Sequence, residues 1–105
     1  MDNYKNAVVS FLSLYKFAKL KKQLDKNPSN YDYIIYKVED YFEQLELYEI
    51  EVLELRYIEN YSLEKIANAL NYKSHSSVSS IINKNLLKLA TYEKQLINNE
   101  GGDSF

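Results

Sequence analysis

Glycine and proline are almost absent from the body of this chain. Among its 105 residues there are two glycines and one proline, and both glycines fall in the terminal stretch NNEGGDSF. Hairpin turns depend on residues of this kind, whereas helix interiors exclude them. Apolar residues instead recur at three- and four-residue intervals, which is the period of one face of an α-helix. The sequence therefore predicts an all-α fold of about five helices in a single domain, residues 1–105.

The N-terminal part, residues 1–44, is expected to form a helical hairpin. One helix should cover about residues 3–26 and the next about residues 29–44, because the stretch between them contains the proline, which ends one helix and suits the start of another. The side chains expected to face the core are Tyr4, Val8, Phe11, Tyr15 and Ala18 in the first helix, and Tyr31, Ile34, Ile35, Val38, Tyr41, Phe42 and Leu45 in or just after the second. Five tyrosines lie between residues 31 and 48, mostly at this core spacing, which favours packing over base stacking.

The C-terminal part, residues 45–98, has the pattern of a helix-turn-helix. Three helices are expected, over residues 48–59, 63–70 and from Ser74 or His75 to 98, with residues 99–105 as a flexible tail. In the first of these three, Ile50, Leu53 and Tyr57, with Val52, are expected to turn inward. Ser62 is placed to cap the second, and Asn60 and Asn71 stand where a left-handed residue closes a helix.

Composition excludes several classes of site. The chain has no cysteine and one histidine, so disulfides, thiolate metal sites and histidine clusters have no ligands to draw on. No nucleophile–base pair or phosphate loop is present, so we expect neither an enzyme nor a bound cofactor. The longest uncharged run, Asn6 to Tyr15, is too short for a membrane helix. We expect a cytoplasmic protein with no membrane contact.

The charge is unevenly distributed although the net charge is only -2. Residues 1–28 hold six lysines and two acidic residues, residues 29–64 hold ten acidic residues against Lys37 and Arg56, and residues 65–105 hold five lysines and three acidic residues. An acidic middle between basic ends would let one face approach phosphate while another binds a basic partner. The alternative is that each charged run is simply the solvated face of an amphipathic helix.

Residues 45–89 resemble the fourth region of bacterial RNA polymerase sigma factors, the domain that reads the upstream promoter element. The residues that carry the resemblance are Leu45, Val52-Leu53-Glu54-Leu55-Arg56-Tyr57, Asn60, Ser62, Ile66-Ala67, Leu70-Asn71, Val78, Ile81, Leu86 and Leu89. The chain departs from the family by having asparagine at both glycine positions and one extra residue between Leu70 and Val78. Its last helix also lacks the arginines and glutamate that sigma factors use there.

The resemblance implies a small transcriptional regulator rather than a complete sigma factor, for which 105 residues leave no room. A helical N-terminal part followed by a sigma-like helix-turn-helix resembles the late-gene activators of phages that infect Gram-positive bacteria. The implied partner is double-stranded DNA, with RNA polymerase as a second partner. We expect a sequence-specific DNA-binding regulator encoded by a phage or another mobile element.

The predicted DNA contacts lie at the start of the last helix. At about 100° per residue, the side opposite Val78 and Ile82 carries polar residues, and recognition helices present their N-terminal turns to base edges. Ser76, Ser77, Ser80 and Asn83 are expected to read bases, Lys73 and Lys84 to hold phosphates, and Ser74 to lie at the helix start within the same surface. Leu87 points away from the core, and with Ile97 it is expected to contribute to a homodimer.

A protein-interaction module is the main alternative. In that case the acidic segment from Glu39 to Glu59 would dock on RNA polymerase or on a sigma factor without sequence-specific DNA contact. A purely structural helical bundle also fits the composition, but this hypothesis does not explain the break between Leu70 and Val78. Enrichment of bound fragments from a random DNA pool would distinguish the DNA-binding hypothesis from these two alternatives.

Overall fold

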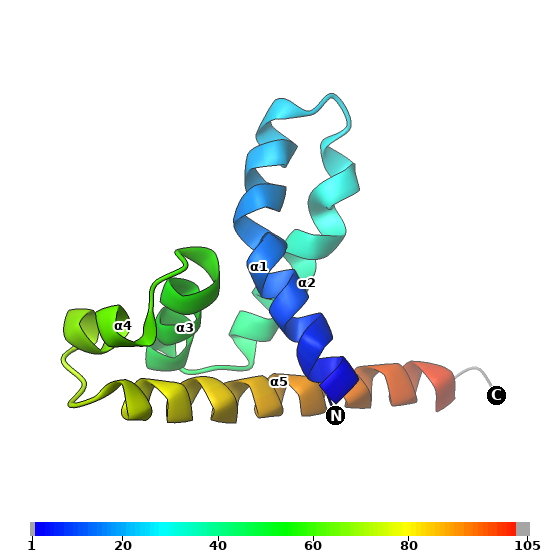
Figure 1. The fold of residues 1–105 in the computed structure, drawn as a ribbon. Helices are drawn as coiled ribbons and strands as arrows, with labels where there is room; N and C mark the ends of the chain where they lie inside the picture. Colours follow the sequence, from blue (N-terminus) through cyan, green and yellow to red (C-terminus); the bar gives the residue numbers. More distant parts are fainter. Residues whose placement is uncertain (1, 103–105) are drawn as a thin grey trace.

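The computed structural model describes residues 2–102 and is all-helical over that range. Its elements are α1 (Asp2–Leu24), a 3-10 turn η1 (Pro28–Tyr31), α2 (Asp32–Glu43), α3 (Leu47–Leu53), a π-helical turn η2 (Glu54–Ile58), α4 (Leu63–Leu70) and α5 (His75–Gly102). Figure 1 shows α1 and α2 as a hairpin whose base contacts the long α5 and whose far end projects away from it. α3 and α4 lie beside the first half of α5. The predicted all-α fold with five helices is confirmed.

One core joins all five helices. It is built from Val8 and Leu12 of α1, Val38 and Tyr41 of α2, Val52 and Leu53 of α3, Ile66 and Ala67 of α4, and Val78, Ile82, Leu86 and Leu89 of α5. The first turns of α1 lie against α5, so the hairpin and the C-terminal helices share this core. The predicted inward position of Ile66 is confirmed, since this side chain is fully buried.

Several predicted boundaries need correction. α1 ends at Leu24 rather than residue 26, and the segment that begins at Pro28 first forms the 3-10 turn η1, so α2 starts at Asp32. The helix predicted over 48–59 is α-helical only to Leu53 and then widens into η2. α5 continues to Gly102 rather than ending at residue 98, so residues 99–102 are helical rather than a flexible tail. The rest of the predicted tail, 103–105, lies outside the described residues.

The predicted inward faces also need correction in three places. Leu12, which the spacing argument omitted, is fully buried. Val52 is fully buried whereas Ile50 is half-buried, because α3 turns a slightly different side to the core than predicted. Among the tyrosines between residues 31 and 48, Tyr33, Tyr36 and Tyr48 are at least half exposed, so most of this group does not pack in the core.

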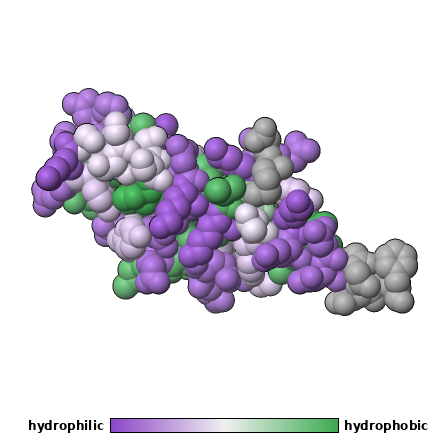
Figure 2. All heavy atoms as spheres, turned by 90° about the horizontal axis from the view of Figure 1, so that it is seen from below, coloured by the Kyte–Doolittle hydropathy of each residue, from purple (hydrophilic) through white to green (hydrophobic). Residues whose placement is uncertain are grey.

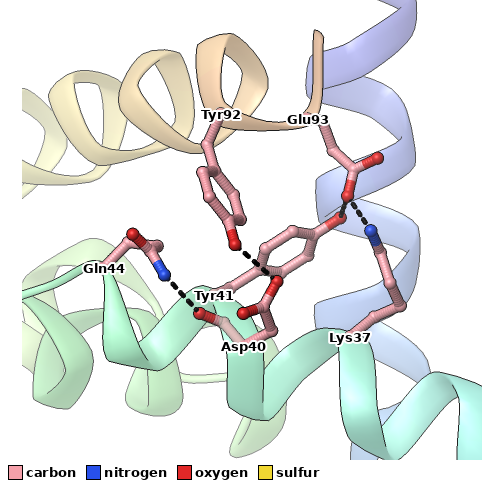
Figure 3. A network of polar contacts seen from close by, with 6 residues as sticks. All are labelled: Lys37, Asp40, Tyr41, Gln44, Tyr92 and Glu93. Carbon is pink, nitrogen blue, oxygen red and sulfur yellow. Dashed lines mark hydrogen bonds and ion pairs between the residues drawn. The ribbon is translucent and has the colours of Figure 1, made fainter. Parts of the chain in front are cut away.

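The end of α2 is fixed to α5 by a polar network that sequence spacing did not predict (Figure 3). The ammonium of Lys37 forms an ion pair with the Glu93 carboxylate, and the Tyr41 hydroxyl donates to Glu93 Oε1 at 2.9 Å. All three side chains are buried. Beside them the Tyr92 hydroxyl donates to Asp40 Oδ2 at 2.8 Å. These bonds set how the hairpin stands on α5, because both helices supply charged or hydroxyl groups that have little access to water.

Candidate nucleic-acid interface

The interface begins with α4 and the turn that joins it to α5. Ser62 caps α4, since its hydroxyl oxygen accepts from the Lys65 N–H at 3.1 Å. Asn71 ends it in the left-handed conformation (φ 61°, ψ 36°), and the Tyr72 N–H donates to the Ala67 carbonyl at 2.9 Å. This is the bond pattern of a Schellman helix end, in which asparagine replaces the commoner glycine. The predicted cap and the predicted left-handed residue are both confirmed.

The preceding helix ends in a related way. Asn60 has φ 60°, and the Tyr61 N–H donates to the Leu55 carbonyl at 2.8 Å after the π-helical turn η2. Arg56, the sole arginine, donates from Nη1 to the Tyr61 carbonyl at 3.0 Å. The arginine therefore holds the loop between η2 and α4 rather than reaching outward. Wide π-turns are uncommon and often lie near functional sites, and this one positions the start of α4.

The turn after Asn71 leads directly into the predicted contact residues. Ser74 lies just before α5, and its hydroxyl oxygen accepts from the Ser77 N–H at 3.4 Å, so it serves as a loose helix cap. Lys73, Ser74, Ser76, Ser80, Asn83 and Lys84 are all exposed, and Ser77 is half-buried. The structure thus brings the seven residues together on the turn and the first three turns of α5. Ser77 is the least accessible of them because it lies beside the buried Val78.

The other side of these helical turns is buried. Val78 is fully buried, Ile82 is 5% exposed and Leu86 is 2% exposed, so the polar residues lie opposite the core as the helical period predicts. α5 packs on α4 and on α3 through this apolar side. Seen from the α5 side, the surface is mostly hydrophilic with smaller hydrophobic areas (Figure 2). The first turns of α5 therefore pack against α3 and α4 on one side and are exposed to solvent on the other.

Farther along α5 the surface has features that sequence spacing did not predict. Gln44, Lys88, Thr91, Tyr92 and Gln95 line a shallow pocket of ≈ 330 Å³ between the end of α2 and α5. Lys88 Nζ lies 4.0 Å from the buried carboxylate oxygen Oε1 of Glu49. Burial, together with the hydrogen bond to Asp40, raises the pKa of Tyr92 to about 12, so its hydroxyl remains a donor at neutral pH. This side chain belongs to the network that fixes α2, and we assign it no contact with DNA.

Asn85 was also missed, because its place between apolar positions cannot be read from residue type. It is fully buried, and its Nδ2 donates to the Ile81 carbonyl at 2.8 Å. Its Oδ1 has no hydrogen-bond partner among the described residues. A buried asparagine that bonds back to its own helix adds no chemistry to the outer face, so the candidate interface consists of the exposed serines, Asn83 and the two lysines.

No known family model matches this chain, and no curated protein and no solved structure matches it. Among residues 2–102, no helix has the length and apolar content required to cross a membrane. No group of three or more histidine, cysteine, aspartate or glutamate side chains in the described part of the chain is arranged to hold a metal ion.

Proposed function

We propose that this chain is a transcriptional regulator that binds double-stranded DNA sequence-specifically through the first three turns of α5. The observation that supports the proposal is the exposure of Ser76, Ser80, Asn83 and Lys84 on the side of α5 opposite its buried stripe, behind a turn closed by Asn71. A recognition helix enters the major groove with its first turns and is supported by the preceding helix. α5 and α4 have this relationship, and the resemblance of residues 45–89 to sigma region 4 agrees with it.

The chemistry of the surface suits base reading with few phosphate contacts. An asparagine amide pairs with two groups of adenine in the major groove, and serine hydroxyls donate or accept at several base edges. The nearby lysines, Lys73 and Lys84, are both exposed and can neutralise phosphates. Because only two cations lie in this patch, one copy would bind DNA weakly and with a shallow dependence on salt.

Selection from a random pool of DNA duplexes tests the proposal directly. The purified chain is expected to enrich a defined sequence, and Asn83→Ala is expected to lose preference at particular base pairs. Asn98→Ala is the matched control, since Asn98 is an exposed asparagine on the same helix beyond the proposed contact turns. Enrichment of no sequence, or equal binding of the selected and scrambled duplexes by the parent chain, would contradict sequence-specific binding.

A second candidate function is supported by the surface of α3. Leu47 is 85% exposed at the start of this helix, and Glu46, Tyr48 and Glu51 beside it are exposed as well. An apolar side chain surrounded by carboxylates suits a basic protein surface, such as one on RNA polymerase. We therefore include polymerase as a proposed partner. Leu47→Glu should abolish co-sedimentation of the chain with purified bacterial RNA polymerase, and it should leave DNA selection unchanged.

A further inference from the structure

α1 carries a second apolar stripe on the side that faces away from the core. Its members are Leu14 (44% exposed), Phe17 (52%), Leu20 (53%) and Leu24 (72%). At about 100° per residue these four side chains fall within an arc of about 120°, roughly opposite the buried Val8 and Leu12. They lie in the half of α1 that stands away from α5 (Figure 1). A helix face that is exposed to solvent normally carries polar side chains, whereas here four positions spaced three or four residues apart carry large apolar ones.

The exposed apolar area is large for a chain of this size. Four large apolar side chains, each 44% to 72% exposed, lie on one side of the helix, and large exposed apolar patches on monomers are often functional. By contrast, Leu87 and Ile97 on α5 are ten residues apart, which is about 15 Å along a helix, and the polar residues Thr91 and Lys94 lie between them on the exposed side. The α1 stripe is therefore the stronger candidate for an interface than the two α5 positions that sequence spacing indicated.

The charges around the stripe favour an identical partner over an acidic one. Lys16 pairs with Glu59 at 3.8 Å and Lys22 pairs with Asp32 at 2.6 Å, so two of the neighbouring cations already have partners within the chain. Lys19 lies over the Tyr15 ring at 5.2 Å, on the packed side of the helix. Apart from Lys21 the stripe is uncharged, so two copies of it can face each other with like charges meeting at that position alone.

Three of the four stripe residues, Leu14, Phe17 and Leu24, also lie at the spacing of a two-helix seam. Ser10, Leu14, Phe17, Lys21 and Leu24 follow one another at intervals of four, three, four and three residues, which is the repeat of a coiled coil. Lys21 is the single charged residue in the seam, and its ammonium lies 5.7 Å from the centre of the Phe17 ring in the same chain. A lone lysine at such a position lowers the stability of a pair but fixes its register and number of strands.

We propose that the outer stripe of α1 pairs with the same stripe of a second copy, with the two helices parallel. The parallel orientation rests on the proposed function: the hairpin stands away from α5, so parallel pairing places both α5 helices at the same end, where they can meet one duplex. Two stripes of four side chains each would form a small interface, at the lower end of the sizes of specific interfaces. The dimer has modest affinity in solution, and simultaneous binding of two half-sites strengthens it.

Sedimentation velocity of the full chain without DNA, over a range of concentrations, tests the pairing. We expect dimer at high concentration, and Phe17→Glu should raise the dimer dissociation constant at least about tenfold. Leu47→Glu is the matched control, because it places the same charge at another exposed apolar position, and it should leave the constant unchanged. Circular dichroism verifies that both variants remain helical. A parent chain that is monomeric at every concentration, or dimerisation abolished by Leu87→Glu but not by Phe17→Glu, would overturn the proposal.

Cross-linking tests the relative orientation of the two α1 helices. Because the chain has no cysteine of its own, a disulfide can form only at an introduced position. Parallel pairing brings the two copies of position 24 together, so Leu24→Cys alone should form a disulfide-linked dimer on mild oxidation. If linkage instead requires mixing Leu14→Cys chains with Leu24→Cys chains, the helices are antiparallel and the proposed arrangement is wrong. Both experiments are done without DNA, so failure of the DNA selection and failure of the dimer remain distinguishable.

Discussion

At the scale of the residue, two asparagines and one buried ion pair account for much of the local geometry. Asn60 and Asn71 have positive φ values of 60° and 61° and close η2 and α4. A residue with a Cβ pays about 1 to 2 kcal/mol for this conformation, and asparagine bears the cost better than most because its short polar side chain can bond locally. Lys37 and Glu93 are the charged pair in the core, and each depends on the other because neither can be hydrated.

Replacing Asn71 should therefore separate conformation from side-chain chemistry. Asn71→Ala is expected to lower the free energy of unfolding by about 1 kcal/mol, since alanine resists the left-handed conformation, whereas Asn71→Gly should retain or slightly raise stability. Urea denaturation measures both. Equal losses for the two variants would show that the Asn71 side chain, rather than its backbone conformation, stabilises the turn.

Breaking the buried ion pair should be far more costly than breaking an exposed one. Lys37→Met leaves the Glu93 carboxylate buried with the Tyr41 hydroxyl as its donor, and it should cost about 3 kcal/mol. The double variant Lys37→Met/Glu93→Gln removes the charge while keeping an acceptor for Tyr41, so it should recover most of that loss.

Lys22→Met is the control for this series, because its ion pair with Asp32 is about half exposed. Its loss should not exceed about 1 kcal/mol. Denaturation of the four chains under identical conditions compares them, and a double variant no more stable than Lys37→Met would contradict the explanation through an unpaired charge.

The raised pKa values of two tyrosines in the same network predict how the free energy of unfolding depends on pH. The pKa of Tyr92 is raised to about 12, and burial, with the bond to Glu93, also raises the pKa of Tyr41 well above its ordinary value of 10.0. The folded state therefore keeps protons that the unfolded state releases, so this stabilisation is complete below pH 10 and is lost as pH rises through about 12. Tyr92→Phe should flatten the fall in unfolding free energy between these values, whereas Tyr48→Phe, at an exposed site, should not.

At the scale of the element, the two sides of α5 differ in composition. One side is buried against α1, α3 and α4, and the other carries serines, Asn83 and Lys84. Because the side chains on the outer side of α5 are not part of the core, substitutions there should change DNA binding without unfolding the chain. The outer side in turn contains two chemistries, since lysine attracts any phosphate whereas an amide distinguishes one base edge from another.

A salt series separates those chemistries. Lys84→Ala should weaken binding to every duplex by a similar factor and reduce the slope of log affinity against log salt by about one unit. Asn83→Ala and Ser80→Ala should leave the slope unchanged and relax preference at single base pairs, by roughly 1 to 3 kcal/mol for a good contact and less for a serine. Lys94→Ala is the control for a cation outside the proposed turns. If the first three variants all bind selected and scrambled duplexes as the parent does, the outer side of α5 is ordinary solvated helix.

At the scale of the whole molecule, the hairpin and the C-terminal helices share one core. Leu12 and Val8 of α1 enter the same core as Leu86 and Leu89 of α5, and the Lys37–Glu93 pair fixes α2 to the same helix. The molecule is nevertheless elongated, with extents of 49 × 37 × 21 Å, because α5 is long and the distal half of the hairpin extends beyond the core. That extension is what exposes the outer stripe of α1.

This shared core predicts that the C-terminal part does not fold alone. A fragment of residues 45–105 loses Val8, Leu12 and Val38 from the core, so it should be largely unfolded, while the full chain unfolds in a single transition. Thermal unfolding followed by circular dichroism compares the two. A fragment with its own sharp transition would instead show that residues 45–105 are an independent domain and that the hairpin is an addition to it.

The sequence predicts the helices, because periodicity, caps and breakers act over a few residues: Ser62, Asn60, Asn71 and the stretch at Pro28 mark helix ends that depend on local backbone chemistry. It also predicted which side of α5 is buried, since one helix face follows from its period. Which charged residues lie inside and which apolar ones lie outside depends on how distant segments pack together. Lys37 and Glu93 are 56 positions apart and become a pair only when α2 docks on α5. Leu12 faces the core and Leu14 does not because α5 and α2 contact one side of α1 alone, and contacts between distant segments are not written in the spacing of either one.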